Sequence, residues 1–516
     1  MLITFIIYLV VMLLIGGVAT LRARSRDDFI LAGRQLGPFA AALSASATSM
    51  SGWLFMGLPG KVLQVGLSAA WIAVGCILGD YANWRLTCAR LRKQSDKLSA
   101  LTLPEFITGC RQDRLAKLTR LLAGLAIVVF MTIYLCAQLV ATGKTLSGPL
   151  GLGDYAIDYR TAVLIGASVI ILYTSLGGFV AVVWTDVIQS LIMCLALIGL
   201  PIYCVFLVIS QGNGAEIWTQ PTLDDPNVAM GSLWGAPGSG MGVMMAMSIF
   251  VMLIDKFGVG AGYLGQPQIA SRFMALRDER DSKIARRIGV SWTAITALGA
   301  VTVALCAPLL ISELPDDPEQ ILLVMTREHF PGWLSGVVIA ALMAAVMSSA
   351  DSFLMSAVSS IQQDFPGPLR AAARSPWVTR AIIIALGVAA TWYTLSIDPN
   401  DESNSVLNLA QQGWAGLSIA LAVPVLYCLG TERSRTGVVL LTMLLGIGMM
   451  ILWQLTGLSN HVYEVIPCLA AQTLVCFLAH RWPGTPSEPP EEADPRRCRA
   501  MAESPSLSGG IGSPVS

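Results

Sequence analysis

Apolar segments long enough to cross a lipid bilayer recur along the whole of this chain. A helix needs roughly 20 apolar residues to cross about 30 Å of hydrocarbon, and a window of that length predicts about thirteen crossings. The composition of the 516 residues agrees, because 54% are hydrophobic and only 13% are charged. We therefore expect an all-α membrane protein. The predicted spans are 2–21, 38–59, 67–86, 120–143, 161–180, 187–209, 240–265, 288–311, 332–360, 379–396, 406–429, 436–456 and 463–481.

The charges between the spans predict how the chain is oriented. Lys and Arg gather after odd-numbered spans, for example in 22–34, 90–120 and 272–287, whereas 312–331 and 397–405 are rich in Asp and Glu. Cytoplasmic loops carry the excess of basic residues in membrane proteins. We therefore expect the N-terminus outside the cell and the C-terminus inside.

Two of the predicted spans have a chemistry that lipid cannot accommodate. The second span carries five hydroxyl side chains between Ser44 and Ser51 and then several glycines, and the seventh carries four glycines from Gly258 to Gly265 followed by Pro267. Freed backbone groups and hydroxyls need partners that hydrocarbon does not supply. Both spans therefore predict broken helices, and 344–352 of the ninth span adds a third polar stretch. Close helix packing through small residues is the alternative interpretation.

The spacing of the broken spans predicts an internal repeat. Four spans separate them, which fits two repeats of five helices with opposite membrane orientation and a binding site where the breaks meet. We expect four regions: an extra N-terminal helix with a basic loop (1–34), a ten-helix transport core (35–430), two C-terminal helices (431–482) and a disordered cytoplasmic tail (483–516). The tail is rich in Pro, Glu, Ser and Gly, which cannot bury a core.

Four motifs carry a resemblance to a known family. They are Met50-Ser-Gly-Trp53, Trp184-Thr-Asp-Val-Ile-Gln189, Gly262-Tyr-Leu-Gly-Gln-Pro267 and Ala344-Ala-Val-Met-Ser-Ser349. The chain is similar to the sodium/solute symporter family, and within it to the bacterial members that carry proline. The resemblance implies the LeuT-type fold, residence in the bacterial cytoplasmic (inner) membrane and uptake of L-proline driven by a sodium gradient.

The resemblance also implies where sodium binds. Sodium is a hard cation that prefers several oxygen ligands. The implied set comprises the carbonyls of three residues, two hydroxyls and one carboxylate: Ala47, Met50, Ala345, Ser348, Ser349 and Asp186. The serines can instead bond back to a carbonyl one turn earlier, and Asp186 can instead cap a helix N-terminus. Asp351 is a further candidate, because carboxylates at membrane depth are usually functional.

The expected solute site lies beside the ion. A small zwitterion needs donors for its carboxylate and aromatic faces for its apolar part. The residues that offer these groups are Ser51, Trp53, Gly57, Tyr134, Tyr263 and Pro267. Aromatic residues in a membrane helix can also face lipid or the protein core.

The sequence departs from the proline-carrying members at two positions. Ser49 stands where those members have aspartate, and Val259 stands where they have tryptophan. The first change predicts weaker sodium binding, another ion preference or compensation by a different carboxylate, for which Asp255, next to Lys256, is one candidate. The second change predicts a reshaped solute pocket.

Other functions fit the sequence less well. The departures leave open a symporter for another small amino acid or organic solute, coupled to sodium or protons. A transporter-like sensor is disfavoured because the tail after Arg481 is too short for a catalytic domain. An enzyme is disfavoured because the three histidines lie in predicted loops or helix ends, without nucleophile or metal spacing. The expected partners are a small zwitterion, Na⁺ and lipid, with no nucleic acid and no obligate protein partner.

Overall fold

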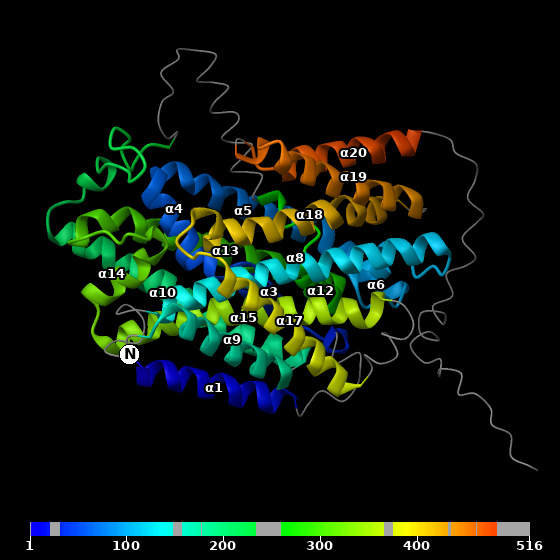
Figure 1. Cartoon of the computed structure of the whole chain (residues 1–516), viewed down its shortest axis with the longest axis horizontal. Coiled ribbons are helices and arrows are strands. Elements are labelled where there is room, and N and C mark those ends of the chain that lie inside the picture. Colours follow the sequence, from blue (N-terminus) through cyan, green and yellow to red (C-terminus); the bar gives the residue numbers. More distant parts are fainter. Residues whose placement is uncertain are drawn as a thin grey trace, which may run out of the picture.

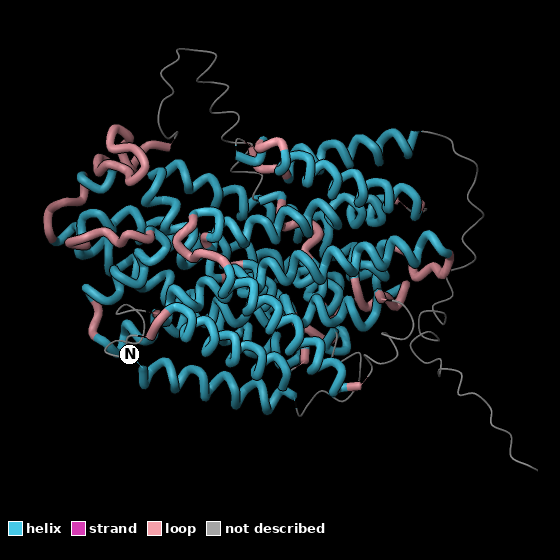
Figure 2. The backbone as a smooth tube through the Cα atoms, in the orientation of Figure 1, coloured by secondary structure: helices cyan, strands magenta, loops and turns pink. Residues whose placement is uncertain are grey.

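All regular structure in the described part of the chain is helical. The computed structural model describes residues 2–20, 31–147, 157–176, 178–233, 260–365, 375–431, 435–460 and 462–481. Within these ranges β pairing is limited to isolated bridges, Leu36 with Leu276 and Pro221 with Ala229. Figure 2 shows helices joined by loops and turns. The predicted all-α class is confirmed.

The helices alternate between long membrane-length elements and short pieces at breaks and loops. They are α1 (Leu2–Thr20), α3 (Pro38–Ser49), α4 (Leu58–Val65), α5 (Ala70–Asn83), α6 (Ala89–Lys97), α7 (Leu103–Ile107), α8 (Arg114–Leu146), α9 (Tyr159–Leu176), α10 (Phe179–Ser210), α12 (Pro267–Ala275), α13 (Ser282–Leu310), α14 (Ile321–His329), α15 (Gly332–Asp364), α17 (Pro376–Ser396), α18 (Val406–Gly430), α19 (Thr436–Leu455) and α20 (Val465–Arg481). A wide π-type turn over Trp53–Gly57 leads into α4, and another over Trp84–Cys88 joins α5 to α6.

Eight helical stretches of the described residues are long and apolar enough to cross a membrane. Three shorter apolar helices, Ile3–Ile15, Tyr159–Ser175 and Val465–Arg481, fall on three more of the predicted spans. Most of the predicted seventh span, together with Asp255, Lys256 and Val259, lies outside the described residues. The protein is therefore a multi-pass helical membrane protein, and the count of thirteen crossings stays a prediction.

The long helices lie roughly side by side along the long axis of the molecule (Figure 1). The apolar window of α15 is 94% buried and that of α18 is 83% buried, whereas those of α17 and α19 are only 28% buried. α15 packs against α8 and α10, and α3 packs against α10 and α13. The polar segments of the second and ninth predicted spans therefore lie in the interior of the bundle.

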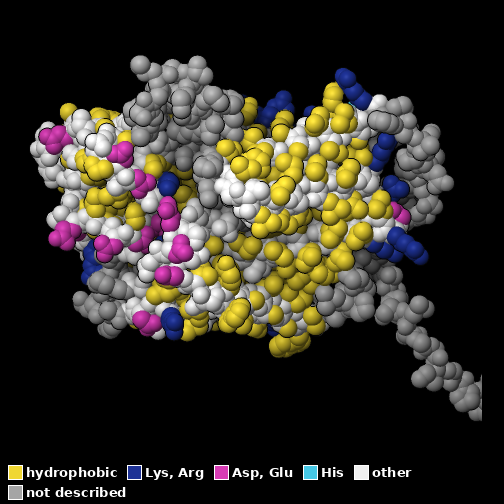
Figure 3. All heavy atoms as spheres, turned by 45° about the horizontal axis from the view of Figure 1, so that its top comes forward, with side chains coloured by type: hydrophobic (Ala, Val, Ile, Leu, Met, Phe, Trp, Pro, Cys, Tyr) yellow, Lys and Arg dark blue, Asp and Glu magenta, His cyan; other side chains and the backbone are white. Residues whose placement is uncertain are grey.

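The surface separates an apolar belt from two charged ends. Figure 3 shows hydrophobic side chains across the middle of the molecule, with Asp and Glu gathered at one end and Lys and Arg mainly at the other. Large exposed side chains such as Trp377, Trp392 and Leu455 belong to the peripheral helices α17 and α19. An apolar belt of this kind is what lipid requires of a spanning protein.

Candidate ion and solute site

The helix of the second predicted span ends at Ser49, deep inside the bundle. Met50 has φ −96° and ψ 68°, which no helix contains, and helical structure resumes as a wide turn over Trp53–Gly57. Ser49 contributes to the break because its Oγ donates to the carbonyls of Ala45 and Ser46 at 2.9 and 3.1 Å. A hydroxyl that bonds back in this way competes with the regular helix ladder. The predicted break is confirmed.

The described part of the seventh predicted span is broken as well. Residues 262–265 form turns, and α12 begins only at Pro267. Gly265 has φ 77°, a left-handed conformation that favours glycine. A Cβ there would also lie 2.5 Å from the backbone nitrogen of Ala422 on α18. The chain therefore turns here at close contact with another helix.

At the first break, α3 and α15 bring oxygen atoms together. The Ser348 Oγ lies 3.2 Å from the Ala47 carbonyl and 3.1 Å from the Ala345 carbonyl, and the Ser349 Oγ donates to the Thr48 carbonyl at 3.1 Å. All of these residues are fully buried. Ser348 can donate its single hydroxyl proton to only one of these two carbonyls at a time. The other carbonyl then receives no hydrogen bond from Ser348. Several neutral oxygens with fewer protons than acceptors suit a hard monovalent cation.

The predicted sodium ligands lie in three places: the oxygen cluster, the break at Met50, and the layer of Asp186 described below. Ala47, Ala345, Ser348 and Ser349 converge in this cluster, whereas Met50 lies at the break with its sulfur 3.7 Å from the Tyr263 hydroxyl. Ser348 also makes the bond back along its own helix that the alternative interpretation predicted. The Thr48 carbonyl belongs to the cluster and was not predicted. Its only sequence signal is its place between Ala47 and the break.

Asp186 lies in a neighbouring buried layer, where it pairs with a base. Its Oδ2 accepts from the Ser44 Oγ at 2.6 Å and from Arg272 at 3.0 Å, and the Thr48 Oγ1 is 3.5 Å away. Arg272 also donates to the Ser352 Oγ at 2.7 Å, and that hydroxyl lies 3.1 Å from the Thr48 Oγ1. Thr48 therefore links the ion pair to the oxygen cluster through its side chain and its carbonyl.

Two interpretations of this layer were wrong. Asp186 is the eighth residue of α10, which starts at Phe179, so it does not cap the helix. Arg272 was counted among the loop charges of 272–287, but it is only 1% exposed and its guanidinium lies 4.9 Å from the centre of the Phe179 ring. The short α12 carries it into the bundle because Pro267 starts a new helix there.

Asp351 faces a different set of polar groups. It is fully buried, and neither of its carboxylate oxygens has a hydrogen-bond partner among the described residues. Its carboxylate lies close to Asp186, Tyr8 and Tyr173. The Asp186 Oδ1, the Gln189 Oε1 and the Tyr173 hydroxyl likewise lack partners among the described residues. These atoms form a second group of buried polar groups, contributed by α1, α9, α10 and α15.

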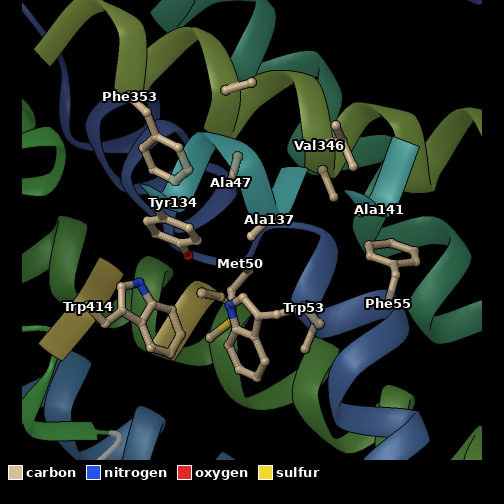
Figure 4. Packing of buried hydrophobic residues seen from close by; sticks show 14 of the residues in the cluster. Ala47, Met50, Trp53, Phe55, Tyr134, Ala137, Ala141, Val346, Phe353 and Trp414 are labelled. Carbon is tan, nitrogen blue, oxygen red and sulfur yellow. The ribbon is translucent and has the colours of Figure 1, made fainter. Parts of the chain in front are cut away.

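The aromatic residues predicted for the solute gather around Trp414 of α18. Trp53, Tyr134 and Tyr263 have ring centres 5.2, 5.8 and 5.7 Å from the Trp414 ring. Tyr134 also stacks on Phe353 of α15 at 4.0 Å. Figure 4 shows Tyr134 between Phe353 and Trp414, with Trp53 and Met50 beside them. Sequence reasoning missed Trp414 and Phe353, because single aromatics in apolar spans give no signal of their own.

Ser51 joins this aromatic group to a polar side chain that was also missed. Its Oγ lies 3.3 Å from the Tyr134 hydroxyl and accepts from the Gln138 Nε2 at 3.2 Å. The Gln138 Oε1 accepts from the Gly52 backbone nitrogen at 3.1 Å and so satisfies one group freed by the break. A fully buried glutamine in an apolar span was the available signal.

The other two predicted solute residues lie outside this group. Gly57 lines an open cavity at the acidic end, together with Lys144 and Glu319. A Cβ on Gly57 would lie 2.8 Å from the Leu407 Cβ, so glycine is needed for packing against α18. Pro267 lines a cavity of about 40 Å³ on the other side of the break, beside Arg272. That volume suits a water or two and no larger solute.

The broken helices, the buried oxygen cluster and the apolar belt define a helical membrane transporter. Among solved structures, a Na⁺-coupled sialic acid symporter in a substrate-bound outward-open state matches with a TM-score of 0.67 at 19% identity, covering 92% of this chain and 97% of that one. The nucleobase-cation-symport-1 transporter Mhp1 matches with a TM-score of 0.51 at 13% identity, covering 89% and 96%. These likenesses show the fold alone.

The family follows from sequence comparison. The model of the sodium:solute symporter family matches residues 29–446. The sodium/proline symporter of Escherichia coli K12 is 35% identical, covering 90% of both chains. The high-affinity proline transporter PutP of Bacillus subtilis is also 35% identical, covering 92% of this chain and 97% of its own length. The chain belongs to the sodium:solute symporter family.

Proposed function

We propose that this protein takes up L-proline together with Na⁺ across the bacterial cytoplasmic membrane. Family membership and the names of the relatives support sodium as the coupling ion and proline as the solute. The observation that carries the proposal is the oxygen cluster at the break, where Ser348 and Ser349 meet the carbonyls of Ala47 and Thr48. Such a cluster can bind Na⁺ with neutral ligands and release it again.

In this proposal sodium and solute share the break in the second span. Ala47, Ala345, Ser348 and Ser349 hold the ion, with the Met50 carbonyl completing the set at the end of α3. Asp186 acts from the neighbouring layer, where Arg272 fixes its carboxylate next to Thr48. Sodium bound at the Ala47 carbonyl stabilises the non-helical backbone at Met50. It thereby also fixes the solute-binding residues that follow, from Ser51 on.

The solute occupies the space bounded by Ser51 and the aromatic rings around Trp414. The Ser51 hydroxyl and backbone nitrogens freed by the break meet its carboxylate, and Trp53, Tyr134 and Tyr263 face its ring. These rings are at most 1% exposed, so they have to separate for the solute to enter. Gly57 belongs to the outer approach to this space and Pro267 to the inner one, which fits alternating access by two repeats of five helices.

The same proposal includes the orientation and the division of the chain. The acidic end, with α4 and α14, faces outside, and the basic end faces the cytoplasm (Figures 1 and 3). The N-terminus lies at the acidic end. Residues 35–430 form the transport core, flanked by 1–34 and 431–482, with 483–516 as the cytoplasmic tail.

Labelled proline uptake into liposomes holding the purified chain tests the function. We expect accumulation with an inward sodium gradient and none with an equal potassium gradient. Uptake that ignores sodium would contradict the coupling, and a failure of unlabelled proline to compete would contradict the solute. The alternative is another small amino acid or a proton-coupled cycle. Ser49 favours this alternative, because its neutral side chain at the break bonds back to its own helix.

A further inference from the structure

Asp80 is a buried carboxylate that the proposed transport site does not use. It lies ten residues into α5, about 15 Å from the start of that helix, and it is 4% exposed. The Thr293 Oγ1 donates to its Oδ2 at 3.2 Å, from the middle of α13. A charged side chain at this depth costs at least ~2.5–3.5 kcal/mol in membrane insertion. Such a carboxylate therefore calls for a functional explanation.

The surroundings of Asp80 differ from those of three other buried acids, which each form an ion pair: Asp186 with Arg272, Glu319 with Lys144 and Asp364 with Arg120. They also differ from those of Asp351, which has no hydrogen-bond partner among the described residues. No basic side chain of the described residues pairs with Asp80. The two bases of α13 nearest to Thr293 in sequence are Arg287, which is exposed, and Arg286. Arg286 is seven residues before Thr293, about 10 Å along the helix, and its guanidinium stacks over the Tyr81 ring at 5.2 Å.

Asp80 lies behind the break, on the side of α3 that faces α13. The Ser46 Oγ contacts the Gly289 carbonyl of α13 at 3.5 Å and marks this side. The oxygen cluster of Ser348 and Ser349 lies on the side of α3 that faces α15. The two sides of the broken helix therefore carry different groups, neutral oxygens toward α15 and a carboxylate toward α13.

Tyr263 connects Asp80 to the break. Its hydroxyl lies 3.7 Å from the Met50 sulfur at the break, and the Asn83 Nδ2, one turn after Asp80 on α5, donates to its carbonyl at 2.9 Å. Cys76 and Tyr263 are the titratable groups that face Asp80 from α5 and from the turn before α12. Both are neutral near pH 7. Among the described residues around Tyr263, Asp80 is therefore the group that can carry a negative charge.

We propose that Asp80 is the carboxylate of a second cation site, on the α13 side of the break, which takes one monovalent inorganic cation, sodium or a proton, during the transport cycle. The site is built on Asp80 and the Thr293 hydroxyl that bonds to it, with Tyr263 and Ser49 on the side of the break. Because a buried charge needs an opposite charge, a cation bound there neutralises Asp80 while Tyr263 faces the solute. The proposal rests on the proposed sodium-coupled uptake.

The test compares the wild-type chain with Asp80→Asn in liposomes, by measuring labelled proline, labelled sodium and charge movement together. We expect Asp80→Asn to move one positive charge fewer per proline. If sodium occupies the site, the ratio of sodium to proline also falls by one. If a proton occupies it, that ratio is unchanged, and the pH dependence of wild-type uptake is lost in the variant. Unchanged charge movement in Asp80→Asn overturns the proposal.

Further variants keep the result decisive if Asp80→Asn is poorly inserted. Asp80→Glu retains the charge and should retain the wild-type ratio. Ser49→Asp combined with Asp80→Asn returns a carboxylate from the opposite side of Tyr263, and we expect it to recover the lost charge, which a purely structural role would not do. The matched control is Thr302→Val on the same α13, whose exposed hydroxyl donates back to the Leu298 carbonyl.

Two outcomes separate this proposal from its alternatives. Lys256 lies outside the described residues, and Lys256→Met should leave the charge per proline unchanged; the same loss as in Asp80→Asn would mean an ion pair and overturn the cation site. Wild-type uptake that ignores sodium would contradict the proposed function. The Asp80 test depends instead on the difference between variant and wild type.

Discussion

The two ends of α8 carry similar ion clusters in different surroundings. At the basic end, Arg120 lies 3.2 Å from Glu105 and 3.5 Å from Asp364. At the acidic end, Lys144 lies 2.8 Å from Asp317 and 2.7 Å from Glu319. Each cluster sets one base between two acids and ties the same long helix to other elements, so α8 is anchored at both ends of the transport path.

The acids of the basic-end cluster are the more deeply buried ones and are densely bonded. Asp364 is fully buried and also accepts from the Thr102 Oγ1 at 2.9 Å and the Ser360 Oγ at 3.0 Å. The acids of this cluster come from α7 and from the end of α15. Separating α7 and α15 from α8 would therefore leave buried charges without their partners, which is strongly destabilising.

The acidic-end cluster borders the open cavity that Gly57 lines. The Asp317 side chain is 22% exposed, and Glu319 lies on a short turn, Pro318–Gln320. Glu319 additionally accepts from the backbone nitrogens of Val406 and Leu407 at 3.1 Å each, at the start of α18. Water can replace part of these contacts. The comparison teaches that the acidic end can separate at a lower free-energy cost than the basic end.

The largest expected effect comes from Arg120→Ala. It leaves two buried acids without their base, and breaking a buried pair in this way costs about 3–5 kcal/mol. We expect a marked drop in the unfolding temperature of the detergent-purified protein and a loss of uptake. Arg120→Lys keeps a charge and should lose less. An Arg120→Ala variant as stable as the wild type would contradict the idea that the basic-end cluster is the costlier one to break.

A smaller loss is expected from Lys144→Met. The variant leaves Glu319 with its two backbone donors and with access to water, so we expect a cost of about 1–3 kcal/mol. The matched control is Lys144→Arg, which keeps the charge. Uptake and unfolding temperature are measured as for Arg120. If Lys144→Met is as damaging as Arg120→Ala, the two ends do not differ in the way the cavity suggests.

Sequence reasoning reached the local features of this architecture and missed its pairings. The break at Met50 was predictable, because Ser49, Ser51 and Gly52 disturb a helix through their own chemistry. The position of Arg272 was not, because its partner Asp186 comes from another helix and no local pattern encodes the pair. Gln138 gave only the signal of a polar residue in an apolar span, which does not identify its partners Ser51 and Gly52. From the sequence, Arg272 was assigned to the basic loop that follows the seventh span. In the structure it is buried and pairs with Asp186.

Between the two ends, the oxygen cluster predicts a moderate effect on ion affinity. Ser349→Ala removes one neutral oxygen, worth about 1 kcal/mol, and should raise the sodium concentration for half-maximal uptake about fivefold with an unchanged unfolding temperature. Ser168→Ala, an exposed hydroxyl that bonds back to Leu164 on α9, is the control. An unchanged sodium dependence would refute Ser349 as a ligand and leave the two clusters as the main polar features of the path.

The smallest expected effect is at the rim of the open cavity at the acidic end. Lys61 lies 3.5 Å from Glu402, whose side chain is 70% exposed. Exposed pairs of this kind contribute about 0–1 kcal/mol and are screened by salt, so Lys61→Gln should change neither the unfolding temperature nor uptake measurably. Repeating both measurements for Lys61→Gln and Lys144→Met at low and high salt sharpens the comparison. Lys144 is buried, so its effect should persist at high salt, and a salt-sensitive Lys144 effect would place it with Lys61 among the solvated surface charges.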